Sequence, residues 1–209
     1  MDTLSVTASG VKKVFNRRTI FSGIDFKIAG GQSLAITGKN GTGKSTLVKI
    51  IAGVLSPTAG TVAVRFSDHD VHASDLFSLV GFVAPYLQLY DEFTGWENLD
   101  LARRIRGLDL SDHRLDELLQ RMRLTPRKDD RVRTYSSGMK QRLKYAFALL
   151  HAPPLLLLDE PTSNLDTDGI TIVYEIIEEQ KERGIVIVAT NDEDDARRFS
   201  TVVNLEQGV

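Results

Sequence analysis

Gly38-Lys39-Asn40-Gly41-Thr42-Gly43-Lys44-Ser45-Thr46 is the stretch that decides the fold, because it fits the pattern G-x-x-x-x-G-K-[ST]. In such a loop the glycines let backbone N–H groups turn inward around a phosphate, where a side chain would block the approach. Lys44 is expected to reach the β- and γ-phosphates of a nucleotide, and the Ser45 hydroxyl can bind Mg²⁺. The nine residues therefore predict a site for a nucleoside triphosphate with Mg²⁺.

The residues on either side of this loop predict a strand before it and a helix after it. Ser33–Thr37 is a short apolar run, as expected of a buried strand. Apolar residues then recur at i, i+3, i+4 and i+7, which predicts a helix that opens at the loop and stops before Pro57. These residues are Leu47, Ile50, Ile51 and Val54. The N-terminal dipole of that helix would favour a bound phosphate.

Strands are predicted at both ends of the chain. The first 35 residues alternate between apolar and polar types, which indicates antiparallel strands with turns near Asn16 and Gly30-Gly31. Thr61–Phe66 has the pattern of a further strand. The C-terminal third predicts a strand, a helix closed by a glycine, and a second strand, namely Leu155–Leu158, Ile170–Arg183 with Gly184, and Ile185–Thr190. Both of these strands are apolar throughout, as expected of parallel strands that are covered on both faces.

The middle third predicts helices instead of strands. Ser111 is a candidate N-cap for an amphipathic helix, and a second helix starts near Ser136–Gly138. The apolar stripe of the first helix consists of Leu115, Leu118, Leu119 and Met122, and that of the second of Leu143, Phe147 and Leu150. This part is therefore expected to form a helical insertion in an α/β fold.

Composition narrows the possible partners and setting. The 209 residues carry a net charge of −2, so no basic field points to nucleic acid. The absence of cysteine excludes disulfides and thiolate metal sites and suits the cytosol. The most apolar stretches, Ile50–Val64 and Ala146–Leu158, are short for a bilayer span and contain prolines. If the protein serves a membrane, another chain is expected to cross it.

Two carboxylates follow the apolar run Leu155–Leu158. Asp159 at the end of this strand is expected to meet Mg²⁺ from the side opposite Ser45. Glu160 should face another way because side chains alternate along a strand, which suits a carboxylate that polarises an attacking water. An acidic turn after a strand is common, and its place after a phosphate loop gives it significance.

Tyr135-Ser136-Ser137-Gly138-Met139-Lys140-Gln141-Arg142 resembles the signature of ATP-binding-cassette (ABC) ATPases and lies between the phosphate loop and the acidic strand, as that family requires. The resemblance covers nearly the whole chain. Phe15 is similar to the aromatic residue that stacks on adenine, although it could also be plain core. Ser163-Asn164-Leu165-Asp166 resembles the D-loop, Val80–Leu99 the Q-loop segment and Val188–Asp192 the switch segment.

The resemblance implies a shared ATP site. In this family two chains pack head to tail, and each ATP lies between the phosphate loop of one chain and the signature of the other. Ser136, Ser137, Gly138 and Asp166 would then contact a nucleotide held by the partner chain. Ser136 and the N–H groups near Gly138 open a helix, so they can offer donors and a positive dipole end to a γ-phosphate, or Ser136 is simply an N-cap.

The resemblance also implies the architecture. The fold class is α/β, a P-loop NTPase (RecA-like) core with a small antiparallel β subdomain and an inserted helical subdomain. Residues 1–209 are expected to form a single ABC ATPase domain. Within it, residues 1–84 and 151–209 would form the core with the antiparallel subdomain, and residues from about 85 to 150 the helical signature subdomain.

Three positions depart from the family pattern. Pro85 stands where the family has the Q-loop glutamine, and Gln88, three residues later, is the alternative metal contact. Ser137 replaces the second glycine of the signature. Asn191 stands where the family has a histidine beside the γ-phosphate, and its amide can donate a hydrogen bond but cannot become a cation. Losing one transition-state donor costs a rate factor of about 10²–10³, so a surviving amide donor should cost less. With Glu160 and Asn191 as catalytic residues, we expect a slow but genuine ATPase.

The expected function is that of the ATP-binding and ATP-hydrolysing subunit of an ABC transporter. ATP would close a dimer of two such chains, most simply a homodimer, and a separate transmembrane permease would convert that motion into transport. The chain would then be cytoplasmic and peripheral on the inner face of the cell membrane. In its short length and compact helical region the chain most resembles the ATP-binding subunits of the haem-exporter (cytochrome c biogenesis) type. Those of drug and polysaccharide exporters are similar too.

Two other classes of protein share the phosphate loop. A kinase with the same loop would need an acceptor site or lid, which nothing in the sequence supplies. A soluble non-transport ABC ATPase would often carry two cassettes, a coiled-coil insertion or a basic patch, and it stays the alternative.

Two charged clusters lie outside these motifs. Asp68-His69-Asp70-Val71-His72 has metal-ligand residue types but falls where the family has a polar turn. Arg103, Arg104 and Arg106 crowd a segment that in this family faces the membrane subunit, so they either contact that partner or lie on a plain exposed helix.

Overall fold

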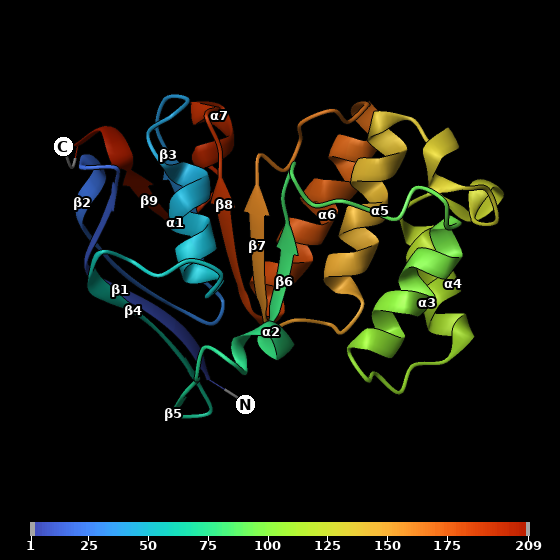
Figure 1. Ribbon diagram of the computed structural model, residues 1–209, viewed down its shortest axis with the longest axis horizontal. Coiled ribbons are helices and arrows are strands. Elements are labelled where there is room, and N and C mark those ends of the chain that lie inside the picture. Colours follow the sequence, from blue (N-terminus) through green and yellow to red (C-terminus); the bar gives the residue numbers. More distant parts are fainter. Residues whose placement is uncertain (1–2, 208–209) are drawn as a thin grey trace.

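The computed structural model describes residues 3–207, which form two β-sheets with helices around them (Figure 1). The first sheet is antiparallel, with strand order β2-β1-β4-β5. Its strands are β1 (Leu4–Phe15), β2 (Arg18–Ala29), β4 (Ala59–Phe66) and β5 (His69–Asp70). The predicted turn near Asn16 is confirmed, since Asn16 and Arg17 both have positive φ, at 48° and 66°, as a tight hairpin turn requires.

The second sheet is parallel, with strand order β6-β7-β8-β3-β9. Its strands are β3 (Ser33–Thr37), β6 (Val80–Val83), β7 (Leu155–Asp159), β8 (Ile185–Ala189) and β9 (Thr201–Asn204). Because the strands are parallel, their carboxyl ends all meet at one edge of the sheet, the upper edge in Figure 1. Ligands in open α/β sheets bind outside this edge.

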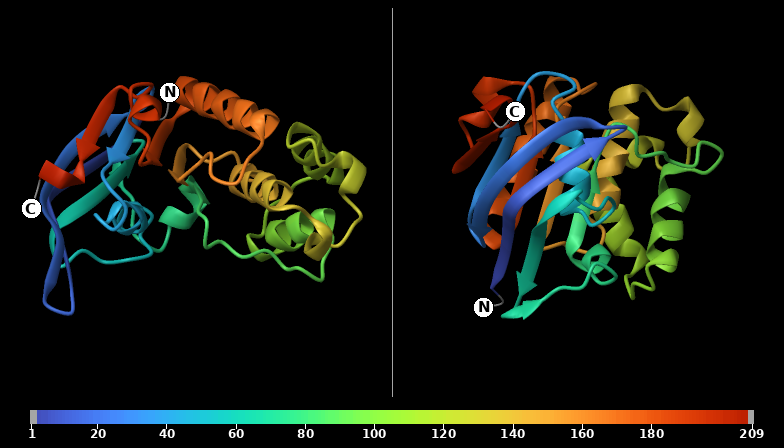
Figure 2. Two further views of the ribbon diagram at one scale, coloured as in Figure 1. Left: turned by 90° about the horizontal axis from the view of Figure 1, so that it is seen from above. Right: turned by 60° about the vertical axis from the view of Figure 1, so that its left-hand side comes forward.

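The helices cover both faces of the parallel sheet and extend beyond one end of it. They are α1 (Lys44–Ile51), α2 (Leu76–Leu79), α3 (Gly95–Ile105), α4 (Asp112–Arg121), α5 (Ser137–Leu149), α6 (Thr167–Arg183) and α7 (Glu193–Ala196), with short 3₁₀ turns at Thr125–Arg127, Val132–Thr134 and Leu205–Gln207. Figure 2 shows α1 and α6 on opposite sides of the sheet. Helices α3 and α4 lie farthest from the antiparallel sheet, on the right of Figure 1.

The apolar run of β7 is continuous because the strand supplies two cores at once. Leu155 and Leu157 pack in a core with α1 and the antiparallel sheet. Leu156 and Leu158 pack in a second core with helices α3 to α6. Successive side chains of a strand point to opposite faces, so a strand buried on both faces needs an apolar residue at every position.

Side-chain caps set where the helices begin. Ser111 accepts a hydrogen bond from the N–H of Arg114 and starts α4, as predicted. Thr94 and Glu97 form a capping box at the start of α3, a helix that the apolar periodicity did not reveal. The first residues of α3 therefore lie inside the segment Val80–Leu99.

The cluster at residues 68–72 forms a hairpin. Ser67 and Asp68 have φ values of 50° and 64° and make the turn between β4 and β5. Among the side chains that the structure describes, no group of three or more histidine or acidic residues is arranged to hold a metal ion. Over the same described part of the chain, none of the helices is both long and apolar enough to cross a membrane.

Gly81 in β6 lets the sheet approach α5 closely, which can be tested by mutation. A Cβ at this position would lie 2.5 Å from the carbonyl oxygen of Ala148 and 2.6 Å from the ring of Pro153. We expect Gly81→Ala to lower the free energy of unfolding by about 1–3 kcal/mol, because the helix end must shift to admit the methyl group. Denaturant unfolding measures this change.

Gly30→Ala is the matched control for that variant. Gly30 is exposed, has no positive φ, and a Cβ there would come no nearer than 3.9 Å to another atom. Its unfolding free energy should stay within about 0.5 kcal/mol of the wild type. Equal stability of the two variants would contradict the packing argument.

Candidate functional site

The glycine-rich loop connects the carboxyl end of β3 to the first residue of α1, Lys44. The Lys44 ammonium group is buried and donates hydrogen bonds to the carbonyl oxygens of Gly38 at 2.8 Å and Lys39 at 3.3 Å. The loop therefore closes around its own lysine, at the positive end of the helix dipole. A phosphate bound here would meet this cation and the backbone N–H groups of the first helical turn.

Two glycines of the loop are required by the packing of neighbouring side chains, and they also leave room for a phosphate to approach the backbone. Gly38 has φ of 142°, and a Cβ there would lie 2.7 Å from Thr42 Oγ1. Gly43 has φ of 103°, and a Cβ there would lie 2.5 Å from a methyl group of Ile20. Residues other than glycine rarely adopt such φ values, so both positions favour glycine even without a bound ligand.

Ser45 and Asp159 meet at the metal end of the site. The Ser45 hydroxyl donates a 3.0 Å hydrogen bond to Asp159 Oδ1. Asp159 is 1% exposed, and its Oδ2 has no hydrogen-bond partner among the described residues. Burial raises the pKa of this carboxyl, and the Ser45 hydrogen bond and the charges of Lys49 and Lys44 oppose the rise. A buried carboxylate oxygen without a partner beside a hydroxyl suits a hard cation such as Mg²⁺.

Glu160 directly follows Asp159 at the end of β7, and its direction is set by its own backbone conformation as well as by strand alternation. Its φ is +49°, a left-handed conformation that ends β7 sharply and re-aims the side chain. Its Oε1 lies 3.7 Å from Lys44 Nζ. Burial raises the pKa of Glu160, and Lys44 and the backbone N–H of Asn191 oppose the rise. The carboxylate therefore lies within reach of a γ-phosphate site and is a better proton acceptor than an exposed glutamate.

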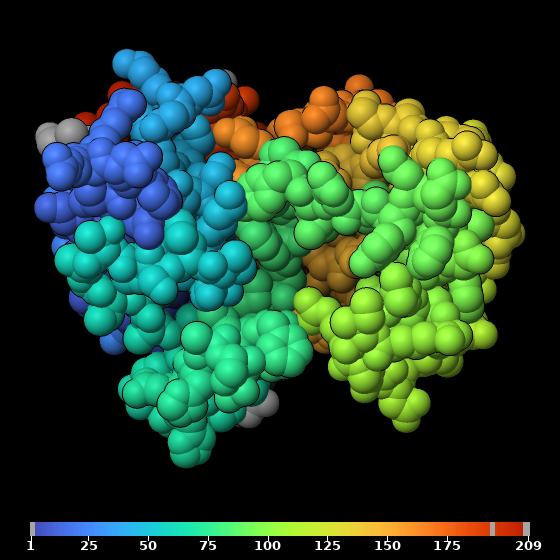
Figure 3. All heavy atoms as spheres, viewed as in Figure 1, coloured from blue at the N-terminus to red at the C-terminus, as the bar shows by residue number. Residues whose placement is uncertain are grey.

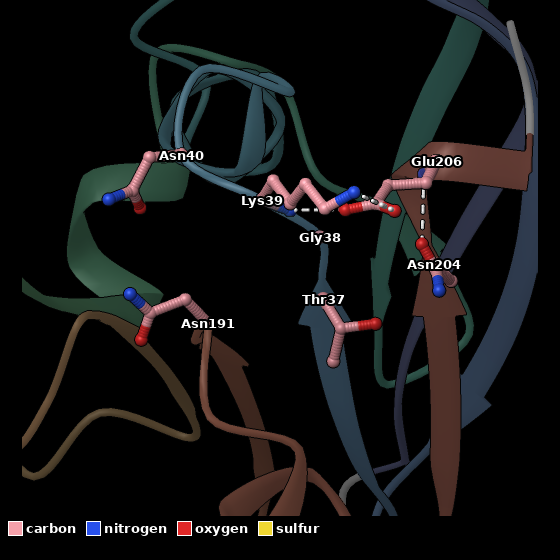
Figure 4. A pocket seen from close by; sticks show the side chains of 7 residues that line it. All are labelled: Thr37, Gly38, Lys39, Asn40, Asn191, Asn204 and Glu206. Atoms are coloured by element: carbon pink, nitrogen blue, oxygen red, sulfur yellow. Dashed lines mark hydrogen bonds and ion pairs between the residues drawn. The ribbon is translucent and has the colours of Figure 1, made fainter.

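Asn191 follows β8 and faces a cavity of ≈ 300 Å³ beside the phosphate loop (Figure 4). Asn191 and Asn40 approach this cavity from two different loops. The lining residues are Thr37, Gly38, Lys39, Asn40, Asn191, Asn204 and Glu206. Glu206, which the sequence did not single out, accepts a 2.7 Å hydrogen bond from the N–H of Lys39 and lies 3.7 Å from its ammonium.

The signature residues lie at the N-terminus of α5, apart from the phosphate loop but at the same edge of the molecule (Figure 1). Ser136 caps the helix by accepting from the N–H of Met139, and Ser136 and Ser137 are exposed. A Cβ at Gly138 would lie 3.2 Å from the carbonyl oxygen of Asn164, so the D-loop segment packs against the signature. The cap role of Ser136 is compatible with nucleotide contact, because exposed N–H groups at this helix start point outward.

Asp166 caps a helix of its own chain, and Phe15 lies exposed at the end of a strand. Asp166 accepts a 2.8 Å hydrogen bond from the N–H of Gly169 and caps α6. Phe15, at the end of β1, is 43% exposed, so it is not plain core. The ammonium of Lys13 lies 4.7 Å from the centre of its ring. Nucleotide contact by either residue stays a prediction.

Pro85 and Gln88 both lie in the loop that follows β6. Both are exposed, and Gln88 lines a hollow with Leu87, Leu89, Asp91, Lys140 and Lys144. Neither Ser45 nor Asp159 is among these lining residues. Metal contact by Gln88 therefore stays a prediction that the loop as described does not support.

The profile of a protein family described as "ABC transporter" matches residues 21–163. The chain belongs to the ABC transporter family.

Relatives and solved structures agree with this membership. The chain is 37% identical over 184 residues to an uncharacterized ABC transporter ATP-binding protein, YdbJ, of Bacillus subtilis, covering 87% of this chain and 59% of that protein. It is 34% identical over 181 residues to the lantibiotic transport ATP-binding protein SrtF of Streptococcus pyogenes, covering 87% and 77%. It spans about three fifths of the length of the first relatives it matches.

Solved ABC proteins share the fold. A dimeric ATP-binding cassette in a post-hydrolysis state with ADP and Pi superposes with a TM-score of 0.82 at 25% identity, covering 95% of this chain and 93% of that one. An ATP-bound bacterial Atm1-family ABC exporter superposes with a TM-score of 0.83 at 26% identity, covering 98% and 37%. The predicted fold class, an α/β P-loop core with an antiparallel β subdomain and added helices, is confirmed.

Three residues near the ABC site were not predicted from sequence. They are Lys144 in α5, Tyr86 in the loop after β6, and Glu206 after the last strand. Lys144 could have been noticed, because it is a charged residue inside the otherwise apolar run Leu143–Leu150. Tyr86 and Glu206 carried no such sign, since Tyr86 lies in a loop and Glu206 in a short 3₁₀ turn, and each reaches the site only through the fold.

The raised pKa of Glu160 predicts a pH-dependent stability. Because folding raises this pKa, the stability that Glu160 contributes is present below the unfolded pKa and is lost as the pH rises through the folded pKa. Glu160→Gln should therefore unfold at a higher temperature than the wild type near pH 7, with EDTA and without nucleotide. The difference should shrink as the pH falls below the ordinary range of a glutamate.

Thermal melts across this pH range measure the effect, with Glu175→Gln as control because Glu175 is an exposed glutamate on α6. Identical melting temperatures of Glu160→Gln and wild type at pH 7 would mean that Lys44 outweighs the burial of Glu160.

Proposed function

We propose that this chain is the ATP-binding and ATP-hydrolysing subunit of an ABC exporter and that it powers transport through a separate membrane permease. One observation carries the proposal: Lys44, Ser45, Asp159 and Glu160 converge at the carboxyl edge of a parallel sheet in a chain that also exposes a signature cap at Ser136. Only the first set is needed to bind a nucleotide. The second adds a surface that a nucleotide on another chain can use.

The geometry suggests how each residue acts on ATP. Mg²⁺, when bound by Ser45 and Asp159, would neutralise charge on the β- and γ-phosphates. Lys44 now bonds to Gly38 and faces Glu160, and phosphate oxygens would take over these donors. Glu160 would then be free to accept a proton from water that attacks the γ-phosphate. The Asn191 amide would donate a neutral hydrogen bond near the same phosphate.

A dimer follows from the positions of the two half-sites. Ser136 and Ser137 are exposed and lie apart from their own phosphate loop, so they would serve the ATP of a second chain. The simplest assembly is a homodimer with two ATP molecules between its chains. In this arrangement residues from about 85 to 150 would act as the signature subdomain against the core of the partner.

Hydrolysis should be slow but measurable. Asn191 keeps one donor at a position where a cation would bind the transition state more strongly. We expect Asn191→His to raise turnover by up to roughly tenfold, and Glu160→Gln to lower it by about 10²-fold or more, because the general base is lost. Phosphate release by the purified chain with MgATP measures all three proteins. Wild-type turnover no higher than that of Glu160→Gln would end the proposal of a genuine ATPase.

An apolar groove is the candidate dock for the permease. It is lined by Ala52, Val54, Phe77, Val80, Phe82, Leu87, Arg106, Phe147 and Ala148. Figure 3 shows the molecule hollowed between the green segment near residue 75 and the yellow-green helical part. Phe77 is 59% exposed, and Arg106 donates a 3.0 Å hydrogen bond to its carbonyl oxygen. Arg106 thus lines the groove, while Arg103 and Arg104 pair with Asp100 on α3.

A permease segment with apolar side chains and one acidic group would suit this groove, because Arg106 is the cation at its rim. We expect Phe77→Asp to reduce recovery of a multi-span permease from detergent-solubilised membranes by about tenfold. Val202→Asp, at an exposed apolar residue of β9, is the control. Both variants should still bind ATP, and equal permease recovery with the two would place the dock elsewhere.

The substrate class is proposed from relatives and is left broad. Relatives named for linearmycin resistance, lantibiotic transport and Nod factor export match at 32–34% identity. They favour drug or antibiotic export over the haem-exporter type that the chain length suggested. The subunit would lie on the cytoplasmic face of the membrane, held there by its permease. A soluble non-transport ABC ATPase is the alternative, and failure of the wild type to bring down any multi-span protein would favour it.

A further inference from the structure

The loop of residues 84–91 joins β6 to the region before α3 and lies between the metal end of the site and α5. Pro85 gives this loop no side-chain donor or acceptor at the position of the family's glutamine. Two features of the surrounding structure nevertheless connect the loop to the site. The inference below rests on the proposed ATPase function.

The first feature is Lys144, in the middle of α5. Its residue is 8% exposed, and its ammonium group donates to the carbonyl oxygens of Ala84 at 3.3 Å and Pro85 at 2.8 Å. Burial lowers the pKa of this lysine, and the charge of Lys140 lowers it further. A buried ammonium group is costly unless it is hydrogen-bonded, so these two carbonyl groups and Lys144 hold one another in place.

A second tie strengthens the first. Lys140, one helical turn before Lys144, forms a 2.7 Å ion pair with Asp91 at the far end of the loop. Residues four apart lie on one face of a helix, so one face of α5 contacts both ends of the loop, through Lys144 and Lys140. The exposed pair contributes little by itself, and Lys144 is the main contact.

The second feature is Tyr86, which directly follows the gripped carbonyl of Pro85. The ammonium of Lys49 on α1 lies 3.9 Å from the centre of its ring, within cation–π range. The ring also meets Phe82 edge to face, with centroids 6.2 Å apart. Burial raises the pKa of the Tyr86 phenol, and the charge of Asp159 raises it further. Tyr86 therefore contacts α1, the helix that follows the phosphate loop and carries Ser45.

We infer that Lys144 is a positioning residue that ties the signature helix to the metal end of the chain's own ATP site, by holding the backbone at Ala84–Pro85 and so placing Tyr86 against Lys49 of α1, the helix that carries Ser45. From Ser137 to Lys144 the helix rises about 10 Å at 1.5 Å per residue. A displacement of the signature by a partner-held nucleotide would thus reach the loop through one rigid helix.

The test compares Lys144→Met, which keeps an apolar stem and loses the donors, with Lys181→Met as matched control. Lys181 also donates from a largely buried stem to a backbone carbonyl, that of Arg198 at 2.9 Å, but on α6. In nucleotide-free protein, amide hydrogen exchange at residues 86–91 should rise about tenfold or more in Lys144→Met and stay unchanged in Lys181→Met. Unchanged exchange at 86–91 in a folded Lys144→Met would overturn the inference.

Kinetics provide the second readout. Lys144→Met should lower kcat for ATP roughly tenfold with KM within about twofold, because a misplaced loop harms the reacting geometry more than binding. Lys144→Arg, which keeps charge and donors, should restore most of kcat. If Lys144→Met fails to fold, Tyr86→Ala, at an exposed residue, should show the same kcat loss, and normal turnover by it would reject the role of Tyr86.

The two proposals fail in different ways. If the wild type hydrolyses no ATP, the proposed function fails, while the exchange experiment still tests the grip of Lys144 on the loop. If the wild type is active and Lys181→Met loses as much kcat as Lys144→Met, the effect is general stability and the inference is wrong.

Discussion

The hydrogen bond from Ser45 Oγ to Asp159 Oδ1 joins the first turn of α1 to the last residue of β7, two points 114 residues apart in the chain. The other contacts of the site depend on this junction. With α1 in this position, Lys44 points back across the loop to Gly38 and lies near Glu160, and Lys49 reaches the ring of Tyr86. The junction itself is possible because β3 and β7 are parallel members of one sheet and end at the same edge.

Two carboxyl groups are buried at this edge of the sheet beside lysine side chains. Asp159 and Glu160 both have raised pKa values, since burial outweighs the attraction of nearby lysines. Such carboxylates are unfavourable in the folded chain and favourable for chemistry, because a cation or a proton relieves the cost of their burial. The left-handed φ of Glu160 adds backbone strain at the same place. The site is therefore less stable by itself than the apolar strands that support it.

Helix α5 runs from the proposed signature past the loop of residues 84–91 to β6. Its first turn presents Ser136 and Ser137 to solvent, its middle contributes Lys144 to the loop of residues 84–91, and its last turn packs on β6 at Gly81. The contacts of Lys144 and of Gly81 each involve backbone atoms on at least one side. Sequence comparison of side chains alone does not reveal contacts of this kind, which explains why Pro85 looked like a simple loss.

Most of the fold could be predicted from sequence because its determinants are local. The glycine loop, the apolar strands before and after it, and the caps Ser111 and Ser136 are each recognisable from neighbouring residues. Helix α3 was missed because its capping box at Thr94 lies in a stretch with little apolar periodicity. The tertiary structure alone decided which distant groups meet: Ser45 with Asp159, Lys44 with Glu160, Lys144 with the backbone at Pro85, and Lys39 with Glu206. The physical reason is that a motif sets the conformation of its own segment, whereas the register of parallel strands and the packing of helices bring segments together.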